Sequence, residues 1–342
     1  MYSCNHCLSG CGRKQMKVTV IIPNYNGKHF MDPCMEALAA QTCQDFEILV
    51  IDNASSDGSV EFIRENYPDT KLLVMESNLG FSGAVNVGIK EATTPYVLLL
   101  NNDTKVRPDF VAEMVKAIES SDKIFSVSSK MVQMYHPDWI DDAGDLYCVI
   151  GWAFQRGISH PVAEAAFCRP YEVFSACAGA AIYRKAVFEE IGYFDEMHFA
   201  YLEDIDVGYR ARIAGCRNLF CPTAVVEHVG SGTSGSKYNS FKVKLAARNS
   251  VYLNYKNMPL LQQIVNALPL AFGWLLKYRF FEKRGFGEDF KAGLKEGWKT
   301  RKTCRKVPFR WKDFGNYLVI EWELIRNFFI YAYEYTHRTQ PK

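Results

Sequence analysis

Residues 96–104 read YVLLLNNDT, a short aliphatic run that turns polar at its end. The run lacks the apolar–polar alternation of a half-exposed strand, so it predicts a β-strand that is covered on both faces. Three earlier runs have the same character: VTVIIP at 18–23, EILVID at 47–52 and KLLVME at 71–76. Segments with helical patterns separate the runs, which is typical of βα units. The first 130 residues therefore predict an α/β fold with a mainly parallel sheet and flanking helices.

Polar side chains come directly after each of these four runs. They are Asn24, Tyr25 and Asn26 after the first, Asn53 and Asp57 after the second, Ser77 and Asn78 after the third, and Asn102 and Asp103 after the fourth. Ligands of open α/β sheets bind beyond the carboxyl ends of the parallel strands. We therefore expect these side chains to converge on one crevice.

The middle of the chain has a different pattern. Residues 130–175 are rich in Trp, Gly, Pro and Asp without a long period, which indicates loops and short strands. Helical patterns follow over 184–191 and 203–214, and Gly215 is suited to cap the second helix.

Two further strands are predicted before the chain becomes helical, aromatic and basic. They are RNLF at 217–220 and TAVVEH at 223–228. We expect residues 16–240 to form the α/β domain and 241–342 a helical region. Residues 1–15 are expected to be a disordered extension.

The charge is unevenly distributed along the chain. The net charge is only +2, but thirteen Lys and Arg stand against five Asp and Glu between Lys277 and Asp313, a net of +8. The rest of the chain therefore carries about −6, and a basic segment follows a mildly acidic body. No recognised nucleic-acid-binding motif accompanies this segment, so we expect no nucleic acid partner.

The cysteines do not form a disulfide framework. The eleven cysteines have no regular spacing, and a chain of 342 residues can bury a core without covalent links, which favours a reducing cytosol. Cys4, Cys7 and Cys11 could bind zinc together with His6, but the usual second pair of ligands is missing. A disordered tail of reduced thiols is the favoured interpretation, and no apolar signal-peptide core is present there.

Two of the polar residues after strands are carboxylates that could bind a nucleotide. Asp103 suits a hard divalent cation that bridges phosphate oxygens, although an acid after a strand is also a common turn or capping residue. Asp52 could accept a hydrogen bond from a nucleobase or cap a helix near Ser59. No Walker-type lysine loop is present, and the glycines of NLGFSGAVNVG (78–88) do not match the dinucleotide fingerprint.

The order of seven segments resembles the family 2 glycosyltransferases with the GT-A fold. The segments are VIIPNYNG (20–27), ILVIDNASSDGS (48–59), NLGFSGAVNVGIKEA (78–92), LLLNNDT (98–104), SACAGAAIYRKAVFEEIGYFDE (175–196), FAYLEDIDVGYRARIAG (199–215) and TAVVEHVGSGTS (223–234). The resemblance runs from about Lys17 to Ser234. Within the family it is strongest to the bacterial rhamnosyltransferase-like branch, which builds surface polysaccharides.

The resemblance implies a nucleotide-sugar site. Asp52 matches the acid that recognises the uracil or thymine imide, and the loop Pro23, Asn24, Tyr25, Asn26 would lie on the other side of the nucleotide. Asn78, Gly83 and Asn102 are expected to belong to the same site. Gly179 matches a small residue that lets the substrate approach the backbone closely.

The resemblance also implies a divalent metal, Mg²⁺ or Mn²⁺. Asp103 matches the last acid of the Asp-X-Asp metal motif, whose first position is here Asn101. Metal binding would therefore depend on a single carboxylate of this motif. His228 matches a histidine that completes the metal or diphosphate site in some relatives, although a lone histidine is as often structural.

The resemblance further implies that the Glu203-Asp204 pair belongs to the segment that holds the general base, with Asp204 in the position of that base. An inverting enzyme uses one in-line displacement, so a single base must deprotonate the acceptor hydroxyl. Arg210 and Arg212 could contact the diphosphate or the acceptor. Glu203 and Asp206 could instead only favour the helix N-terminus through its dipole.

The remaining acids of the acceptor region receive no role. Asp141, Asp142 and Asp145 lie where acceptors are usually chosen in this family. The Gln-x-x-Arg-Trp motif of processive relatives is absent, which favours the transfer of one sugar per encounter.

The helical region contains the apolar segment IVNALPLAFGWLL (264–276), interrupted by Pro269. Its thirteen residues are too few to span a bilayer, which needs about twenty. With the basic stretch and the aromatic residues near the C-terminus, it predicts docking of residues 260–335 on an anionic membrane surface. The alternative is a helical subdomain that packs on the α/β domain.

The sequence thus predicts an inverting, metal-dependent, non-processive glycosyltransferase at the cytoplasmic face of the cell membrane. Its donor would be a UDP- or dTDP-sugar, with rhamnose as one candidate sugar, and its acceptor a lipid-linked or growing cell-surface glycan. The alternative is a nucleotide-sugar or glycan-binding protein that has lost turnover, which the incomplete Asn101-Asn102-Asp103 motif favours. A sugar nucleotidyltransferase would need a triphosphate loop after the first strand, which PNYNGKH (23–29) does not supply.

Overall fold

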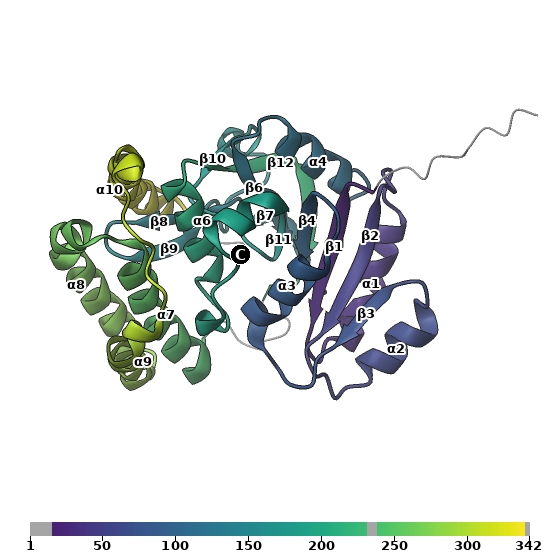
Figure 1. Ribbon diagram of the computed structural model, residues 1–342, viewed down its shortest axis with the longest axis horizontal. Coiled ribbons are helices and arrows are strands. Elements are labelled where there is room, and N and C mark those ends of the chain that lie inside the picture. The colour runs from purple at the N-terminus through teal and green to yellow at the C-terminus, as the bar shows by residue number, and fades with distance from the viewer. Residues whose placement is uncertain (1–15, 231–237, 339–342) are drawn as a thin grey trace, which may run out of the picture.

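A computed structural model of the chain describes residues 16–230 and 238–338. The predicted N-terminal extension and its cysteines lie outside the described residues. Four parallel strands form one half of a ten-stranded sheet (Figure 1). They are β1 (Val18–Asn24), β2 (Phe46–Asp52), β3 (Lys71–Val74) and β4 (Tyr96–Leu100), connected by α1 (Lys28–Ala39), α2 (Ser59–Asn66) and α3 (Gly80–Glu91). The four strands predicted from the aliphatic runs are confirmed.

The other half of the sheet is mixed, and the whole order is β10-β12-β6-β11-β4-β1-β2-β3. Its strands are β6 (Ile124–Gln133), β10 (Tyr171–Val173), β11 (Ala180–Arg184) and β12 (Arg217–His228), with β5 (Thr104–Val106) paired to β12 and β7 (His136–Asp142) paired to β6. β8 (Asp145–Cys148) and β9 (Trp152–Gln155) form a separate hairpin. The two strands predicted over 217–228 are one strand, because β12 continues through an irregularity between Cys221 and Val225.

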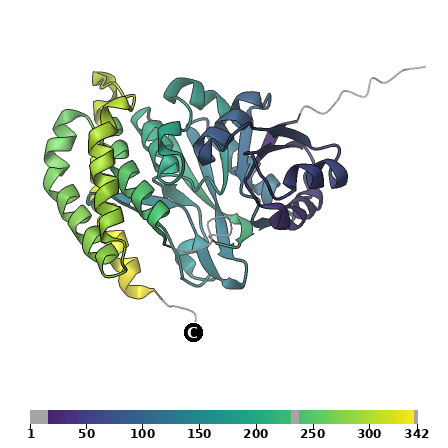
Figure 2. The same cartoon turned by 90° about the horizontal axis from the view of Figure 1, so that it is seen from below.

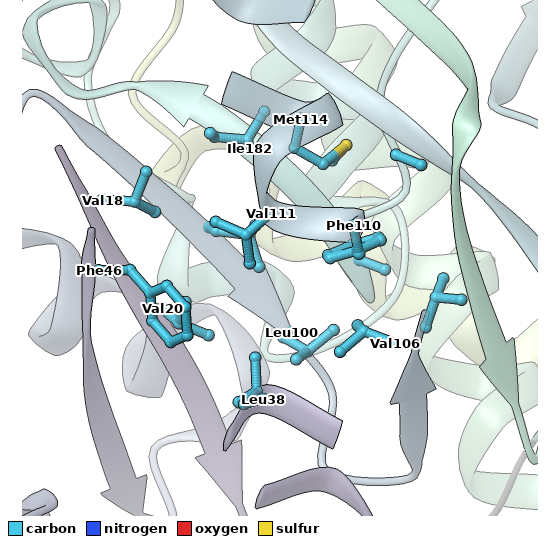
Figure 3. Packing of buried hydrophobic residues seen from close by; sticks show 14 of the residues in the cluster. Val18, Val20, Leu38, Phe46, Leu100, Val106, Phe110, Val111, Met114 and Ile182 are labelled. Carbon is cyan, nitrogen blue, oxygen red and sulfur yellow. The ribbon is translucent and has the colours of Figure 1, made fainter. Parts of the chain in front are cut away.

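Helices cover both faces of the sheet. They are α4 (Phe110–Glu119), α5 (Lys185–Ile191) and α6 (Glu203–Ile213), with short 3₁₀ turns η1 (Ala165–Phe167) and η2 (Glu196–His198). The predicted helices are confirmed, and Gly215, with φ of +83°, follows the end of α6. Along β1, Val18 and Val20 pack in the cluster shown in Figure 3, whereas Ile21 packs on the opposite face. Burial on both faces explains why the strand has no polar alternation.

The C-terminal helices pack against the α/β domain, at the left of Figure 1 and again at the left of Figure 2. They are α7 (Ser240–Asn257), α8 (Leu260–Glu282), α9 (Gly287–Thr300) and α10 (Phe314–His337), with the short turns η3 (Arg301–Thr303) and η4 (Trp311–Asp313). One buried cluster joins Tyr147 and Tyr209 of the domain to Leu253, Leu270 and Leu324 of these helices. Among the described helices, none has the length and apolar character needed to cross a membrane.

Candidate functional site

A cavity of about 430 Å³ opens at the carboxyl ends of the parallel strands. Nine residues predicted for the site line it: Pro23, Asn24, Tyr25, Asn78, Asn102, Gly179, Glu203, Asp204 and His228. A backbone hydrogen bond connects two of these distant segments: Asn101 N–H donates to the carbonyl of Gly179 at 2.8 Å. The predicted convergence of polar residues on one crevice is therefore found.

A chain of side-chain hydrogen bonds connects three of the predicted site residues. Asn102 Nδ2 donates to Asn24 Oδ1 at 2.7 Å, and Asn24 Nδ2 donates to Asp52 Oδ2 at 2.8 Å. The other oxygen of Asp52 accepts from the backbone N–H of Ser55. Asp52 is fully buried and does not line the cavity, whereas Asn24 lines it. Asp52 fixes the orientation of that amide.

Asp103 and His228 meet because β12 pairs antiparallel with β5, which sets His228 opposite Thr104. His228 Nε2 lies 3.4 Å from Asp103 Oδ1, and His228 Nδ1 lies 2.7 Å from Asp141 Oδ2. Burial by itself would lower the pKa of His228, but the neighbouring carboxylates of Asp103 and Asp141 raise that pKa to about 10. The imidazole is therefore held between two carboxylates.

The residues around His228 fit a divalent cation. Asp103 Oδ1 is buried and accepts no hydrogen bond, which leaves a carboxylate oxygen available as a ligand. Carboxylate oxygen together with imidazole nitrogen suits Mn²⁺ better than Mg²⁺, which prefers oxygen ligands. The hydrogen bond from the second ring nitrogen to Asp141 has the geometry that usually orients a histidine ligand.

Four carboxylates gather around the start of α6. Glu203 and Asp204 begin α6, and Asp142 and Asp145 come from β7 and β8. Asp204 is hydrogen-bonded to Asp145, and Asp142, Asp145 and Cys177 present ligand atoms within 4.8 Å of one another. Burial, reinforced by the neighbouring negative charges, raises the pKa of Asp142 to about 7 and that of Glu203 to about 8.

Asp204 combines exposure to the cavity with a proton affinity suited to a base. Burial raises the pKa of its carboxyl above 3.8, while hydrogen bonds from Ile205 N–H and from Asp145 act in the opposite direction. The pKa of Asp145 is raised further still, by burial and by its acidic neighbours. Both carboxyls of this hydrogen-bonded pair therefore hold a proton more readily than an exposed aspartate does.

The loop before these acids has an unusual backbone. Phe199, Tyr201 and Leu202 all have positive φ, at 64°, 70° and 68°, which costs non-glycine residues about 1–3 kcal/mol each. The ring and carbonyl of Phe199 pack so closely on Gly80 that a Cβ there would lie 2.5 Å from them. Phe199, Tyr201 and Gly80 all line the cavity. The strain is therefore concentrated at the site.

A family model described as "Glycosyl transferase family 2" matches residues 19–192, about half of the chain, and these residues contain the parallel strands and most of the cavity. The chain belongs to glycosyltransferase family 2.

Two curated relatives illustrate the sequence similarity of this family 2 glycosyltransferase. An uncharacterized glycosyltransferase of Bacillus subtilis, YwdF, is 27% identical over 53% of this chain and 62% of its own length. The N-acetylglucosaminyl-diphospho-decaprenol L-rhamnosyltransferase of Mycobacterium tuberculosis is 26% identical over 63% of this chain and 77% of its own length. The chain spans less than two thirds of the length of several of the curated relatives it matches.

A solved structure extends the likeness to the helical region. The mannosyltransferase PcManGT from Pyrobaculum calidifontis, in complex with GDP-Man and Mn²⁺, superposes with a TM-score of 0.51. It covers 95% of this chain and 88% of its own, at 15% sequence identity. The predicted GT-A fold, with a helical C-terminal region, is confirmed.

The predicted contact of Arg210 with the diphosphate or acceptor is wrong. The Arg210 guanidinium is buried and donates to Asp206 and to the carbonyls of Ile191, Gly192 and Tyr193. Arg212 likewise binds Glu323 of α10. The i,i+4 spacing of Asp206 and Arg210 on one helix was the signal that favours such a structural pair.

Asp206 anchors α7 to the transferase domain. Lys256 Nζ lies 2.8 Å from Asp206 Oδ2, and Asn257 Nδ2 donates to Asp206 Oδ1 at 2.7 Å. Burial alone would raise the pKa of Asp206, but Lys256 and Arg210 hold it well below its usual range. An interpretation based only on the helix dipole is therefore insufficient for Asp206.

Four other predicted site residues, Asp52, Asp103, Asn26 and Gly83, are not among the residues that line the cavity. Asn26 accepts from the backbone N–H of Ser56 and shapes the turn after β1. Gly83 lies inside α3, where a Cβ would meet the side chain of Leu79 at 2.6 Å. The predictions for Asn26 and Gly83 came from position in a motif, and the structure assigns each of these two residues a local packing role instead.

Several cavity residues were missed from the sequence. They are Gly80, Phe81, Met131, Gln155, Cys177, Phe199, Ala200 and Tyr201. Most come from loops or from the mixed part of the sheet, where hydrophobic periodicity carries no information about a ligand. Asp141 was noticed in DDAGD but received no role, because its partner His228 is 87 residues away in the chain.

Proposed function

We propose that this family 2 glycosyltransferase transfers a sugar, with inversion, from a UDP- or dTDP-sugar to a hydroxyl of a lipid-linked or growing cell-surface glycan. The observation that carries the proposal is the placement of Asp204 and His228 on one cavity. Asp103 and Asp141 flank the histidine, whereas Asp142 and Asp145 lie near Asp204. An in-line displacement needs a proton acceptor at the attacking hydroxyl and a site for a cation at the leaving diphosphate, and these two groups of residues would supply them.

The acid group around Asp204 supports its role as the general base. In the proposed mechanism Asp145 holds the proton of the hydrogen-bonded pair, which leaves the Asp204 carboxylate ionised for proton abstraction from the acceptor hydroxyl. A divalent cation held by Asp103 and His228 would neutralise charge on the departing diphosphate. Asn24 and Asn102, oriented by Asp52, would bind the nucleotide between these groups.

The decisive experiment is a panel of UDP-, dTDP- and GDP-sugars with and without Mn²⁺, comparing the wild type with Asp204→Asn. The amide cannot accept the proton, so kcat should fall by about 10²–10⁴-fold while nucleotide affinity stays the same. Asp122→Asn, an exposed acid on a turn, is the matched control. Transfer by Asp204→Asn at the wild-type rate would disprove the base assignment. Nucleotide binding without turnover by the wild type would favour the non-catalytic alternative.

We also propose that the C-terminal helices place the protein peripherally on the cytoplasmic face of an anionic membrane. α8 and α10 lie together, because Gln262 and Asn266 of α8 donate to Glu321 of α10. Each helix exposes an apolar stripe: Leu260, Ile264, Leu268, Phe272 and Leu275 on α8, and Leu318, Trp322, Ile325, Phe329 and Tyr333 on α10. We call these residues the apolar face. The exposure of these side chains and the nearby basic residues 277–312 support docking.

Flotation with liposomes tests the docking. Leu268 is 83% exposed, so Leu268→Glu should leave the fold intact and reduce flotation with anionic vesicles. Tyr135→Glu, an exposed aromatic residue on the β6–β7 turn, is the control. Equal flotation of Leu268→Glu and wild type would reject this face as the docking surface.

A further inference from the structure

A second concave site lies between α10 and the segment that follows β9. It is a groove of about 420 Å³, a size typical of small-molecule sites. Its walls include Phe167 of η1 and Trp322, Phe329, Ile330 and Tyr333 of α10. No residue of the groove belongs to the cavity described above.

We propose that this groove binds the hydrocarbon chain of a polyisoprenoid diphosphate that carries the acceptor sugar. The inference rests on the proposed function and adds to it the chemical class of the acceptor. An apolar groove on the transferase would hold the chain while the sugar reaches the cavity.

The groove and the cavity share one wall. Gln155, the last residue of β9, lines the cavity, and Arg156, the next residue, lines the groove. Consecutive Cα atoms are about 3.8 Å apart, and neighbouring side chains of an extended segment point to opposite sides. A molecule with a chain, a diphosphate and a sugar could therefore extend from the groove over this wall into the cavity.

The groove opens onto the proposed membrane surface. Trp322, Phe329 and Tyr333 line the groove and also belong to the apolar face, where each remains more than half exposed. The groove is thus continuous with the surface that would contact the bilayer. A lipid chain could enter it from the membrane without crossing water.

Polar groups at the groove suit a phosphate. Arg326 lines the groove, is exposed, and forms no ion pair with any residue that the structure describes. Arg156 is already paired with Glu334. His160 also lines the groove and is 3% exposed; its Nδ1 contacts Glu164, while its Nε2 has no hydrogen-bond partner. A buried polar atom without a partner indicates a ligand that supplies one.

Ala166 offers a way to fill the groove. It lines the groove and is half-buried, whereas its neighbour Ala165 in the same 3₁₀ turn is exposed and does not line it. Ala166→Phe should weaken binding of farnesyl diphosphate to the full-length protein at least about tenfold in calorimetry, because the added ring takes the space of the chain. Binding of inorganic diphosphate should not change, and Ala165→Phe should resemble the wild type.

Arg326→Gln is a second variant that does not endanger folding, because the side chain is exposed. It should weaken farnesyl diphosphate binding several-fold. The proposal is overturned if the wild type binds farnesyl diphosphate no more tightly than inorganic diphosphate, or if Ala166→Phe leaves the farnesyl diphosphate affinity unchanged. Altered vesicle flotation of Ala166→Phe with unchanged farnesyl diphosphate binding would make the groove part of the bilayer contact, which also overturns it.

These binding measurements do not depend on turnover, so they separate the groove from the proposed reaction. Transfer to a farnesyl-diphospho-sugar and to its methyl-diphospho analogue then tests the connection between them. Ala166→Phe should raise KM for the farnesyl acceptor at least tenfold and leave KM for the methyl acceptor unchanged. Failure of the wild type to use either acceptor, with intact farnesyl diphosphate binding, would refute the reaction and not the groove.

Discussion

The side-chain amide of Asn249 on α7 donates a hydrogen bond of 2.8 Å to the backbone carbonyl of Tyr201 in the strained loop. The same amide also donates to the carbonyls of His198 and Ala200. One buried side chain of the helical region therefore holds the backbone that leads into Glu203 and Asp204. We infer that the helices at the C-terminus position the proposed base as well as covering the domain.

Asn249→Ala should lower kcat by about tenfold or more while changing the donor KM little. The substitution removes the donors of three loop carbonyls, so the strained backbone can relax and move the proposed base away from the acceptor. Steady-state kinetics measure the effect. Asn316→Ala removes a similar hydrogen bond from α10 to the carbonyl of Ile213 and is the control. Equal losses in kcat for the two variants would indicate general destabilisation and not positioning.

Asp145 should set the acidic limb of the pH–rate profile. Its hydrogen bond lowers the pKa of Asp204, so removing the donor in Asp145→Ala should shift the limb of kcat/KM to higher pH. Asp145→Asn keeps an N–H donor without the charge and should leave the limb near its wild-type position. A limb that stays in place in Asp145→Ala would show that Asp145 does not share its proton with the proposed base.

Asp142 should make stability decrease with rising pH. Burial raises its folded-state pKa to about 7 from 3.8, so the folded state binds more protons than the unfolded state between these values. The stability gained from this extra bound proton is complete below pH 4 and is lost as the pH rises through 7. Asp142→Asn removes the charge, keeps an oxygen for the Gly144 N–H, and should raise the melting temperature by about 2 °C or more at pH 8.5, and by less at pH 5, where only part of the stability has been lost.

Thermal melts of Asp138→Asn provide the control, because Asp138 lies on the same strand but is exposed. It should change the melting temperature little at either pH. A gain for Asp142→Asn that is the same at pH 5 and pH 8.5 would contradict a titrating carboxyl at position 142.

The parallel half of the fold was predictable because hydrophobic burial leaves a direct pattern in the sequence. Runs such as VTVIIP (18–23) and YVLLL (96–100) have no polar face, and only a strand buried on both sides explains them at that length. The single strand β12 was not predictable as such. Cys221, Pro222 and Thr223 interrupt the pattern where the strand bends, and a local pattern cannot distinguish a bulge from a turn.

From strand topology, the site was predictable where polar residues follow a strand end, whereas Glu203 and Asp204 at the start of α6 were predicted from the family resemblance. Asp103, Asn24 and His228 lie at such ends, so topology brings them together. Arg210 was predicted wrongly, because a charge near an acidic motif gives no information on whether its partner is a ligand or a neighbouring helix. The Asn249 contacts depend on packing between segments about 50 residues apart, which no local pattern encodes.

Asp141 should strengthen metal binding although it lies behind the histidine. Its carboxylate is 2.7 Å from His228 Nδ1, which orients the ring so that Nε2 is directed at Asp103. Carboxylates in this position typically contribute 10–100-fold to the metal affinity of a histidine ligand. Asp141→Asn should therefore weaken Mn²⁺ binding in the presence of UDP by about that factor, measured by calorimetry, and Asp103→Asn should weaken it more. Asp109→Asn, an exposed acid before α4, should have no effect. Unchanged Mn²⁺ affinity in Asp141→Asn would show that His228 is held for structural reasons, and unchanged affinity in Asp103→Asn would remove the metal from this side of the cavity.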